Sequence, residues 1–163
     1  MNKLIVSTLF LMLIATASAS AGQIGEKAPS FALPDMHGRT ISLEQFSGKV
    51  LFVTFWAPWC ITCKVELPEL DALYRKYGKD GLEVMGVSVT GEEEVSTFLR
   101  KVPVNLPILI DKKNEASDAY GVTSLPTGFI IGRDGIIRWV HKGFSKDMLP
   151  FYEKEIKALL IFP

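Results

Sequence analysis

The chain has 163 residues, 48% of them hydrophobic, and its 18 Lys and Arg residues balance its 18 Asp and Glu residues. This length fits a single domain with a sizeable hydrophobic core and leaves no room for a large second domain. A formal net charge of zero argues against a protein that binds nucleic acid through its phosphates, because such proteins carry a basic excess. Two cysteines are too few for the multiple disulfides of a small secreted scaffold.

The first residues have the three-part layout of a secretory signal peptide. A positively charged start at Lys3 precedes a mostly apolar stretch over residues 4–14 and a run of small residues over 15–22. An uncleaved membrane anchor is the alternative interpretation. The apolar stretch is about half of the ~20 residues that a helix needs to span a bilayer, so the sequence favours a cleaved signal.

We therefore expect a signal peptide over residues 1–21, cleaved after Ala19 or Ala21, and a single exported domain over residues 22–163. The mature protein is expected to be soluble and periplasmic or otherwise extracytoplasmic. Outside the cytosol, the bulk compartment does not keep thiols reduced. A pair of cysteines there is oxidised unless a dedicated partner reduces it.

The first half of the domain contains three predicted features. Residues 31–43 read as two short extended segments around a His-Gly turn. Residues 50–56 form an apolar, β-rich run that is typical of a buried central strand. A helix is predicted over residues 60–77, because its apolar residues recur at helical spacing. Pro68 lies inside that helix and is expected to kink it by removing one backbone donor.

The remaining predicted elements alternate between strands and helices. Strands are predicted over residues 82–89, 108–110, 127–131 and 136–140. Three helices are predicted: one begins at residue 92, a short one covers residues 115–120, and the last runs from about residue 146 to 160. Alternation of this kind favours right-handed crossovers and a largely parallel sheet. The turn at residues 133–135 adds an antiparallel hairpin. The sequence thus predicts one α/β domain.

The chemistry concentrates at a Cys-x-x-Cys motif formed by Cys60 and Cys63. Two cysteines three positions apart on one helical turn place both sulfurs on the same side, close enough to form a disulfide. The preceding strand and loop put Cys60 at a helix N-terminus, where unpaired N–H groups stabilise a thiolate, the form that attacks disulfides. We expect an exposed, nucleophilic Cys60, a resolving Cys63, and no cofactor besides their redox-active disulfide.

Other uses of the cysteine pair are less well supported. A structural bridge would close a loop too small to stabilise the fold much. Covalent haem attachment needs a histidine after the second cysteine, where Lys64 stands. Metal binding with His37 or His141 remains open, but no second pair of residues has ligand spacing. Both histidines are otherwise expected on the surface, and no metal site is predicted.

The run Trp-Ala-Pro-Trp-Cys-Ile-Thr-Cys-Lys at residues 56–64 resembles the thioredoxin superfamily. The chain is most similar to the exported TlpA/ResA-like branch, also described as AhpC/TSA-type or redoxin domains. The likeness covers nearly all of the mature chain, including the segments 28–31, 35–38, 46–49 and 120–127, and Asp111. It implies a thioredoxin-like fold with a central, mixed, mostly parallel sheet flanked by helices. It also implies an N-terminal β extension and an inserted helix and strand over residues 92–111.

The resemblance implies roles for residues outside the motif. Pro126 matches the cis-proline that faces the cysteine pair and presents backbone to the substrate, and Leu125 precedes it at a position that tunes substrate choice. Trp59 can supply a flat apolar contact for an incoming chain, with simple packing as the alternative. Trp56 and Trp139 are expected to contribute to packing.

Glu66 matches a glutamate that this branch keeps three residues after the second cysteine. Helical spacing brings it near Cys63, where a carboxylate raises thiol pKa values and can act as a base. A surface glutamate is the alternative. Thr54 stands where plain thioredoxins keep a buried aspartate, which leaves Glu66 as the candidate base. The dipeptide at 61–62 differs from the usual pairs, so the redox potential does not carry over from relatives.

The leading functional hypothesis is an extracytoplasmic thiol-disulfide oxidoreductase that reduces protein disulfides. The resemblance implies a target such as apocytochrome c and a membrane thiol-electron donor of the DsbD/CcdA kind. The protein is expected to be a monomer without nucleic-acid partners. One alternative is a disulfide donor that uses the same site. A thiol peroxidase shares the opening motif but needs a Pro-x-x-x-Thr-x-x-Cys pattern, which is absent before Cys60. A metal-delivery module is a third possibility.

Overall fold

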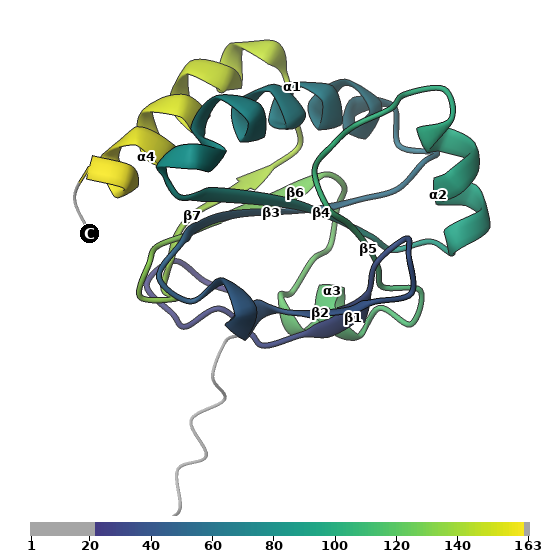
Figure 1. The fold of residues 1–163 in the computed structure, drawn as a ribbon, viewed down its shortest axis with the longest axis horizontal. Helices are drawn as coiled ribbons and strands as arrows, with labels where there is room; N and C mark the ends of the chain where they lie inside the picture. Colours follow the sequence, from purple (N-terminus) through teal and green to yellow (C-terminus); the bar gives the residue numbers. More distant parts are fainter. Residues whose placement is uncertain (1–21, 162–163) are drawn as a thin grey trace, which may run out of the picture.

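The computed structural model describes residues 22–161, so the expected signal peptide over residues 1–21 lies outside the described part of the chain. A five-stranded sheet with the order β5-β4-β3-β6-β7 forms the centre of the domain (Figure 1). Its strands are β3 (Val50–Trp56), β4 (Leu82–Ser88), β5 (Ile108–Ile110), β6 (Thr127–Ile131) and β7 (Ile137–Lys142). Strands β3, β4 and β5 are parallel, whereas β6 is antiparallel to both β3 and β7. The expected mixed sheet is confirmed, with two parallel and two antiparallel pairs of neighbouring strands.

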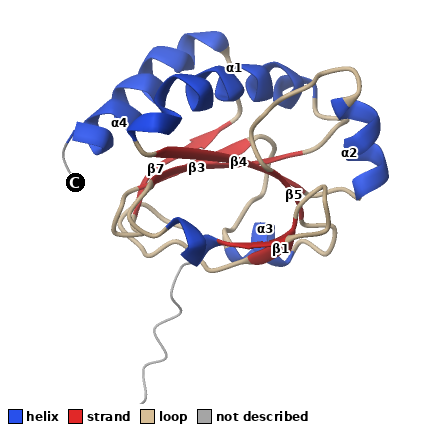
Figure 2. Cartoon of the chain, in the orientation of Figure 1, coloured by secondary structure: helices blue, strands red, loops and turns tan. Residues whose placement is uncertain are grey.

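Helices and a small hairpin cover the two faces of this sheet. Helices α1 (Ile61–Tyr77) and α4 (Leu149–Ile161) lie over one face, as Figure 2 shows. The short helix α3 (Glu115–Ala119) lies on the opposite side, together with the hairpin of β1 (Ala32–Pro34) and β2 (Thr40–Ser42). The hairpin is the expected N-terminal β extension.

The predicted inserted elements are α2 (Glu92–Leu99) and β5, and they lie at one edge of the sheet (Figure 1). Glu92, Glu93 and Glu94 occupy the first turn of α2, where acidic groups favour the positive end of the helix dipole. Strand β5 then pairs in parallel with β4 and forms the edge of the sheet. The insertion therefore adds one strand and one flanking helix to the fold.

The last helix begins later than its apolar pattern predicts. Residues Lys146–Met148 form a short 3-10 turn, η3, and α4 begins at Leu149. A regular helix from Lys146 would need a hydrogen bond from the backbone nitrogen of Pro150 to the Lys146 carbonyl. Proline has no N–H group, but it is well tolerated in the first turn of a helix. Helical structure thus begins near residue 146, as predicted, but the regular α-helix begins three residues later.

The core explains why β3 and β4 carry continuous apolar runs. Every residue of both strands is buried, because a central strand that is covered on both faces has no solvent side. Phe52 and Tyr152 pack edge to face between the sheet and α4, with ring centroids 5.0 Å apart. On the other face, Phe55 and Tyr120 are in contact at 5.2 Å. Both cores fix β3 rigidly, and β3 leads directly into the cysteine motif.

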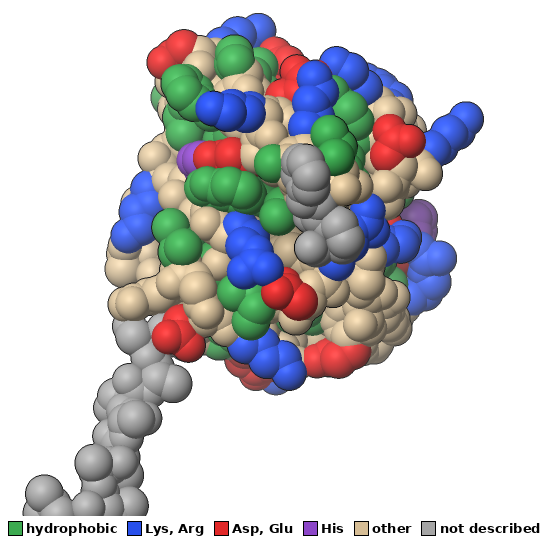
Figure 3. All heavy atoms as spheres, turned by 90° about the vertical axis from the view of Figure 1, so that its left-hand side faces the viewer, with side chains coloured by type: hydrophobic (Ala, Val, Ile, Leu, Met, Phe, Trp, Pro, Cys, Tyr) green, Lys and Arg blue, Asp and Glu red, His purple; other side chains and the backbone are tan. Residues whose placement is uncertain are grey.

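The surface mixes both signs of charge. Figure 3 shows Lys and Arg side chains interspersed with Asp and Glu on one side of the molecule, as expected for a neutral chain. Ion pairs such as Lys146–Glu69 at 3.0 Å and Lys76–Glu153 at 2.6 Å link different elements. Within residues 22–161, no helix is both long enough and apolar enough to cross a membrane.

Candidate active site

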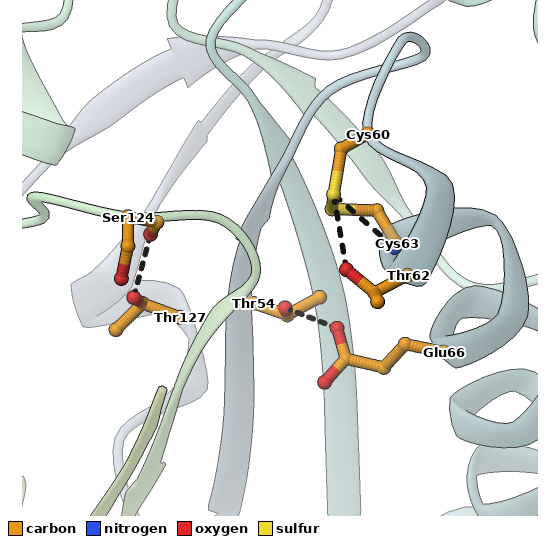
Figure 4. Close-up of a disulfide and its surroundings, with 7 residues drawn as sticks. All are labelled: Thr54, Cys60, Thr62, Cys63, Glu66, Ser124 and Thr127. Atoms are coloured by element: carbon orange, nitrogen blue, oxygen red, sulfur yellow. Dashed lines mark hydrogen bonds between the residues drawn. A yellow bond between two sulfur atoms is a disulfide. The ribbon is translucent and has the colours of Figure 1, made fainter. Parts of the chain in front are cut away.

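Cys60 and Cys63 form a disulfide at the start of α1 (Figure 4). Cys60 is the N-cap residue of the helix, and its Sγ accepts a hydrogen bond from the backbone N–H of Cys63 at 3.2 Å. The hydroxyl oxygen of Thr62 lies 3.5 Å from the same sulfur. The free N–H groups of a helix N-terminus stabilise negative charge. The predicted position of Cys60 at the helix N-terminus is thus confirmed.

The two cysteines differ in their access to solvent. Cys60 keeps 6% of its surface exposed and Cys63 keeps none. The prediction of an exposed Cys60 is therefore wrong for this oxidised state, because the N-cap geometry and the disulfide draw its sulfur over the first turn of α1. Of the two residues, Cys60 is still the one that an incoming disulfide can reach.

Glu66 lies in the interior, so the alternative of a surface glutamate is wrong. Its Oε2 atom accepts a hydrogen bond from the hydroxyl of Thr54 on β3 at 2.8 Å. Its Oε1 atom accepts one from the hydroxyl of Tyr152 on α4 at 3.3 Å. Burial raises the pKa of Glu66 to about 7, and the two hydroxyl bonds offset this only in part. Near neutral pH this carboxyl can therefore both accept and release a proton.

Figure 4 shows how the motif and Glu66 are arranged. Glu66 follows Cys63 by one helical turn on α1, and its carboxyl group points towards Thr54 on the adjacent strand. Thr54 occupies the position where the resemblance predicts an aspartate in plain thioredoxins, and here it holds the carboxylate of a neighbouring helix. The structure thus brings a carboxyl group beneath the cysteine pair from α1 instead of β3.

Tyr152 is a member of the site that sequence reasoning missed. It lies in the helix that the sequence predicts over residues 146–160, and its side chain is fully buried. Its bond to Glu66 joins residues that are 86 positions apart. A local motif carries no signal for such a contact, because the contact depends on how α1 and α4 pack on the same face of the sheet.

The bond between Leu125 and Pro126 is a cis peptide bond, which confirms the predicted isomer. Strand β6 begins directly after it, and Thr127 pairs with Phe55 near the end of β3. This antiparallel register brings the loop before β6 to the end of β3 that leads to the cysteines, as Figure 4 shows for Ser124 and Thr127. Pro126 is buried and Leu125 is half-buried.

Apolar side chains are exposed beside the cysteine pair. Trp59 is 67% exposed, Ile61 78% and Val65 41%. The packing alternative for Trp59 is therefore wrong, since its ring faces solvent. Trp56 lies in the core as predicted, with its ring 5.1 Å from that of Phe98. Monomeric proteins seldom expose neighbouring large apolar side chains without an interaction role.

An open groove of about 540 Å³ lies between the active-site loop and α2. It is lined by Pro58, Trp59, Lys64, Glu93, Glu94, Thr97, Phe98 and Lys101. Trp59 supplies a largely exposed apolar ring, the buried Phe98 lies at the base, and two glutamates and two lysines supply charge of both signs. The inserted helix α2 thus contributes one wall of a groove whose other wall includes Trp59, the residue before Cys60.

The two histidines differ from each other. His37 is exposed, as predicted. The prediction of a surface position for His141 is wrong, because α4 packs beside β7 and leaves only 15% of this side chain exposed. Its Nε2 atom lies 2.7 Å from a carboxylate oxygen of Glu155, and its ring centroid is 4.6 Å from that of Tyr152. Among the described residues, no group of three or more His, Cys, Asp and Glu side chains is arranged to hold a metal ion.

The chemistry of this site is two-electron thiol-disulfide exchange. A cysteine pair at a helix N-terminus supplies the reacting sulfurs. A buried carboxyl group with a pKa of about 7 can serve as a proton acceptor. Exposed apolar side chains flank the cysteine pair in the sequence, and one of them, Trp59, also lines the groove.

Comparisons with known proteins agree with this chemistry. The model of the AhpC/TSA family matches residues 24–140. The thiol-disulfide oxidoreductase ResA of Geobacillus thermodenitrificans is 34% identical over 170 residues, covering 96% of this chain and 97% of the relative. The ResA protein of Bacillus subtilis is 35% identical over 136 residues, covering 82% of this chain and 75% of the relative.

Solved structures give the same result for the fold. A crystal structure of a thiol:disulfide interchange protein DsbE from Chlorobium tepidum superimposes with a TM-score of 0.82 and 33% sequence identity. The match covers 85% of this chain and 98% of that chain. The predicted thioredoxin-like fold is therefore confirmed.

Proposed function

This chain belongs to the AhpC/TSA family and is a thiol-disulfide oxidoreductase of the ResA/DsbE type, and we propose that it reduces protein disulfides outside the cytoplasm. The observation that carries the reducing direction is the buried Glu66 carboxyl close to the cysteine pair. Its hydrogen-bond partners in the described part of the chain are two hydroxyl groups, and neither of them is a cation.

A buried carboxylate close to the sulfurs makes the thiolates of the reduced cysteine pair less stable. Like charges repel, so a carboxylate at Glu66 raises the pKa values of Cys60 and Cys63 and disfavours their thiolates. Strong oxidants of this superfamily owe their high potential to a stabilised reduced form. When the thiolates are not stabilised, the disulfide form is favoured, and the reduced pair is then a good electron donor.

Each residue of the pair has a separate role in the proposed cycle. The Cys60 thiolate attacks one sulfur of a substrate disulfide, which forms a mixed disulfide and releases the first substrate thiolate. Cys63 then transfers its proton to Glu66 and attacks the Cys60 sulfur, which re-forms the internal disulfide and releases the second substrate thiolate. Two electrons pass to the substrate, and the protons of the two thiols end on its two sulfurs, one of them by way of Glu66.

The surface around Cys60 supports docking of a polypeptide rather than a small thiol. Trp59 offers an exposed ring, and its apolar contact needs no specific partner sequence. Pro126 and Leu125 lie at the same end of the sheet and are proposed to present backbone to the substrate chain. In this proposal, the three residues bind substrate, whereas Cys60, Cys63 and Glu66 carry the chemistry.

The location and the partners rest on the sequence and on the resemblance. Residues 1–21 have the layout of a signal peptide, so residues 22–163 would act as a monomeric domain in the periplasm or an equivalent compartment. Apocytochrome c is the proposed substrate. A membrane thiol-electron transporter of the DsbD/CcdA kind is the proposed source of electrons, because an oxidising compartment does not regenerate dithiols by itself.

The redox state of the cysteine pair in living cells tests the direction of exchange. Cells are quenched with acid, free thiols are alkylated with a reagent that adds mass, and the protein is detected on a gel. We expect Cys60 and Cys63 to be mostly reduced, and mostly oxidised when the membrane electron donor is deleted. A pair that is oxidised in both strains would identify a disulfide donor and contradict the proposal.

The substrate is tested separately by staining c-type cytochromes for covalently bound haem in a strain that lacks this protein. Loss of the stain is expected, with recovery on addition of a reducing thiol to the medium. Restoration by the wild-type gene but not by the Cys60→Ser variant links the defect to exchange at this site. Normal cytochromes in the deletion strain would exclude apocytochrome c as the required substrate.

A further inference from the structure

Tyr152 is tied to the active site through a single contact across the protein core. Its hydroxyl donates to Glu66 Oε1, while the hydroxyl of Thr54 donates to Oε2. The three groups come from α4, α1 and β3, so three separate elements converge on one carboxyl group. Both carboxyl oxygens thus have a hydroxyl partner, and Glu66 is oriented from two sides.

The ring of Tyr152 is fixed before its hydroxyl reaches Glu66. Tyr152 has no exposed surface. Its ring centroid lies 5.0 Å from that of Phe52 on β3, 4.6 Å from that of His141 on β7 and 6.1 Å from that of Phe144. A side chain enclosed by three rings has little freedom to move. The position of its hydroxyl is therefore set by the packing of α4 on the sheet.

We propose that Tyr152 is a positioning residue for disulfide exchange: its hydroxyl holds the Glu66 carboxyl and keeps it competent to accept the proton of Cys63. This inference rests on the proposed role of Glu66 as the proton acceptor. Tyr152 itself does not touch the sulfurs or the substrate. It acts through Glu66, and it connects the packing of the C-terminal helix to the rate of exchange.

The direction of the effect follows from the hydrogen bond. A hydroxyl that donates to a carboxylate stabilises the charged form and lowers the carboxyl pKa. For Glu66, the bonds from Thr54 and Tyr152 oppose the larger effect of burial. Burial and the Glu66 charge raise the pKa of the Tyr152 hydroxyl, so this group remains a proton donor in the bond across the working pH range. Without the Tyr152 hydroxyl, Glu66 would remain protonated to a higher pH.

Other titratable groups face this cluster and must be separated from Tyr152. Cys63 lies on the same helix as Glu66, but it does not titrate while it is in the disulfide. Behind the Tyr152 ring, His141 of β7 and Glu155 of α4 form a pair at 2.7 Å. A change in the charge of this pair would also act on Tyr152, so it needs a control of its own.

The titration of Glu66 in the oxidised protein tests the first half of the proposal. It is followed by carbon-13 NMR of labelled glutamate carboxyl groups, and the signal is assigned with Glu66→Gln. We expect Tyr152→Phe, which retains the ring, to raise the Glu66 midpoint by roughly half to one pH unit. Tyr120→Phe is the matched control, because it removes a buried tyrosine hydroxyl that has no hydrogen-bond partner among the described residues. An unmoved Glu66 midpoint in Tyr152→Phe would overturn the proposal.

The pH dependence of protein-disulfide reduction tests the second half. For a one-unit shift, the ionised fraction of Glu66 at pH 7 falls about fivefold, and we expect the rate to fall to a similar extent and to recover at higher pH. A shifted Glu66 midpoint without a shifted rate profile would contradict the role of Glu66 as base, and with it this inference. The direction of exchange in cells is unaffected by that outcome, so a failure here is distinct from a failure of the reductase proposal.

Two further measurements complete the test. Glu155→Gln removes the charge behind Tyr152, and a shift of the Glu66 midpoint as large as that in Tyr152→Phe would assign the effect to the charged pair and overturn the proposal. If Tyr152→Phe does not fold, the wild-type protein still gives an answer. The ring carbon that carries the Tyr152 hydroxyl should then report the same midpoint as Glu66, and a Tyr152 signal that stays constant through this range would contradict the contact.

Discussion

The hydroxyl of Thr54 donates a 2.8 Å hydrogen bond to the Glu66 carboxyl in the interior of the domain. Thr54 lies on the central strand β3, and Glu66 lies in the second turn of the helix that carries the cysteines. The bond therefore joins the two elements on either side of the active-site loop. A carboxyl group that is buried with only hydroxyl partners is costly to ionise, and this cost gives the site an acid-base group near neutral pH.

This cost predicts that Glu66 lowers the stability of the fold as the pH rises. The folded-state pKa is about 7, compared with an ordinary value of 4.5. The folded protein thus holds the proton more tightly than the unfolded chain. The stability that this tighter proton binding at Glu66 contributes is fully present below pH 4.5 and is lost as the pH rises through 7. The shift corresponds to a loss of about 3 kcal/mol in the free energy of unfolding by pH 8.

Glu66→Gln tests this prediction, because glutamine stays neutral at every pH. Urea unfolding of the oxidised protein is measured at pH 4.5 and pH 8. We expect the free energy of unfolding of the variant, relative to that of the wild type, to be about 3 kcal/mol higher at pH 8 than at pH 4.5. Glu69→Gln, on the same helix but partly exposed and paired with Lys146, is the matched control. A stability difference that does not change with pH would show that Glu66 is not buried as described.

Thr54→Val tests the hydroxyl that holds Glu66. Valine has almost the same shape, but it leaves Glu66 Oε2 without its partner. An unsatisfied buried acceptor costs roughly 1–3 kcal/mol, and we expect this loss at pH 8, where Glu66 is charged. A smaller loss is expected at pH 5, where the carboxyl is protonated. Chemical denaturation of the oxidised protein at both pH values measures the difference.

The control for Thr54→Val is Thr127→Val. Thr127 is equally buried, but its hydroxyl donates to the backbone carbonyl of Ser124 at 2.7 Å. That acceptor does not titrate, so the cost of losing its donor should be the same at both pH values. Equal behaviour of the two variants would argue that the Thr54 bond is not coupled to the ionisation of Glu66.

The sequence predicts the local parts of this site well. The apolar run of β3 and the helical spacing after Cys60 place the cysteine pair correctly, because both patterns depend on neighbouring residues. The cis bond before Pro126 was predicted from the resemblance alone. Composition and spacing do not distinguish it from an ordinary turn proline, since the isomer is selected by tertiary contacts.

The parts that sequence reasoning missed depend on contacts between distant elements. His141 is predicted on the surface, yet α4 packs beside it and Glu155 pairs with it. Tyr152 fits a helical apolar face, and that pattern says nothing about where its hydroxyl points. Packing of α4 beside β7 and α1 determines both outcomes, and this packing has no local sequence signal.

The roles of the two cysteines are tested by serine variants under oxidising conditions. We expect Cys60→Ser to lose disulfide exchange with protein substrates by several orders of magnitude, because a serine hydroxyl does not replace the thiolate. Cys63→Ser should instead accumulate mixed disulfides, since the second attack is missing. Non-reducing gels followed by mass spectrometry identify the trapped chains. Mixed disulfides in Cys60→Ser but not in Cys63→Ser would reverse the assignment.

Trp59 is predicted to act in docking and to contribute little to the fold. Its side chain is 67% exposed, so Trp59→Ala should change the free energy of unfolding by no more than about 0.5 kcal/mol. We expect kcat/KM for a protein disulfide to fall about tenfold, equivalent to about 1.4 kcal/mol of lost contact with the substrate. The rate with a small disulfide should stay the same, because such a substrate does not reach the ring.

The control for Trp59 is Phe151, an aromatic residue on α4 that is exposed to a similar extent, 63%. Phe151→Ala should leave both substrates unaffected, which separates a docking role from a general loss of apolar surface. If Trp59→Ala slows the small and the protein disulfide equally, the ring acts on the reactivity of Cys60 and not on docking. That outcome would assign Trp59 a role in the reactivity of the cysteine pair in place of substrate binding. Such a role is physically reasonable because Trp59 directly precedes Cys60, the N-cap residue that carries the attacking sulfur.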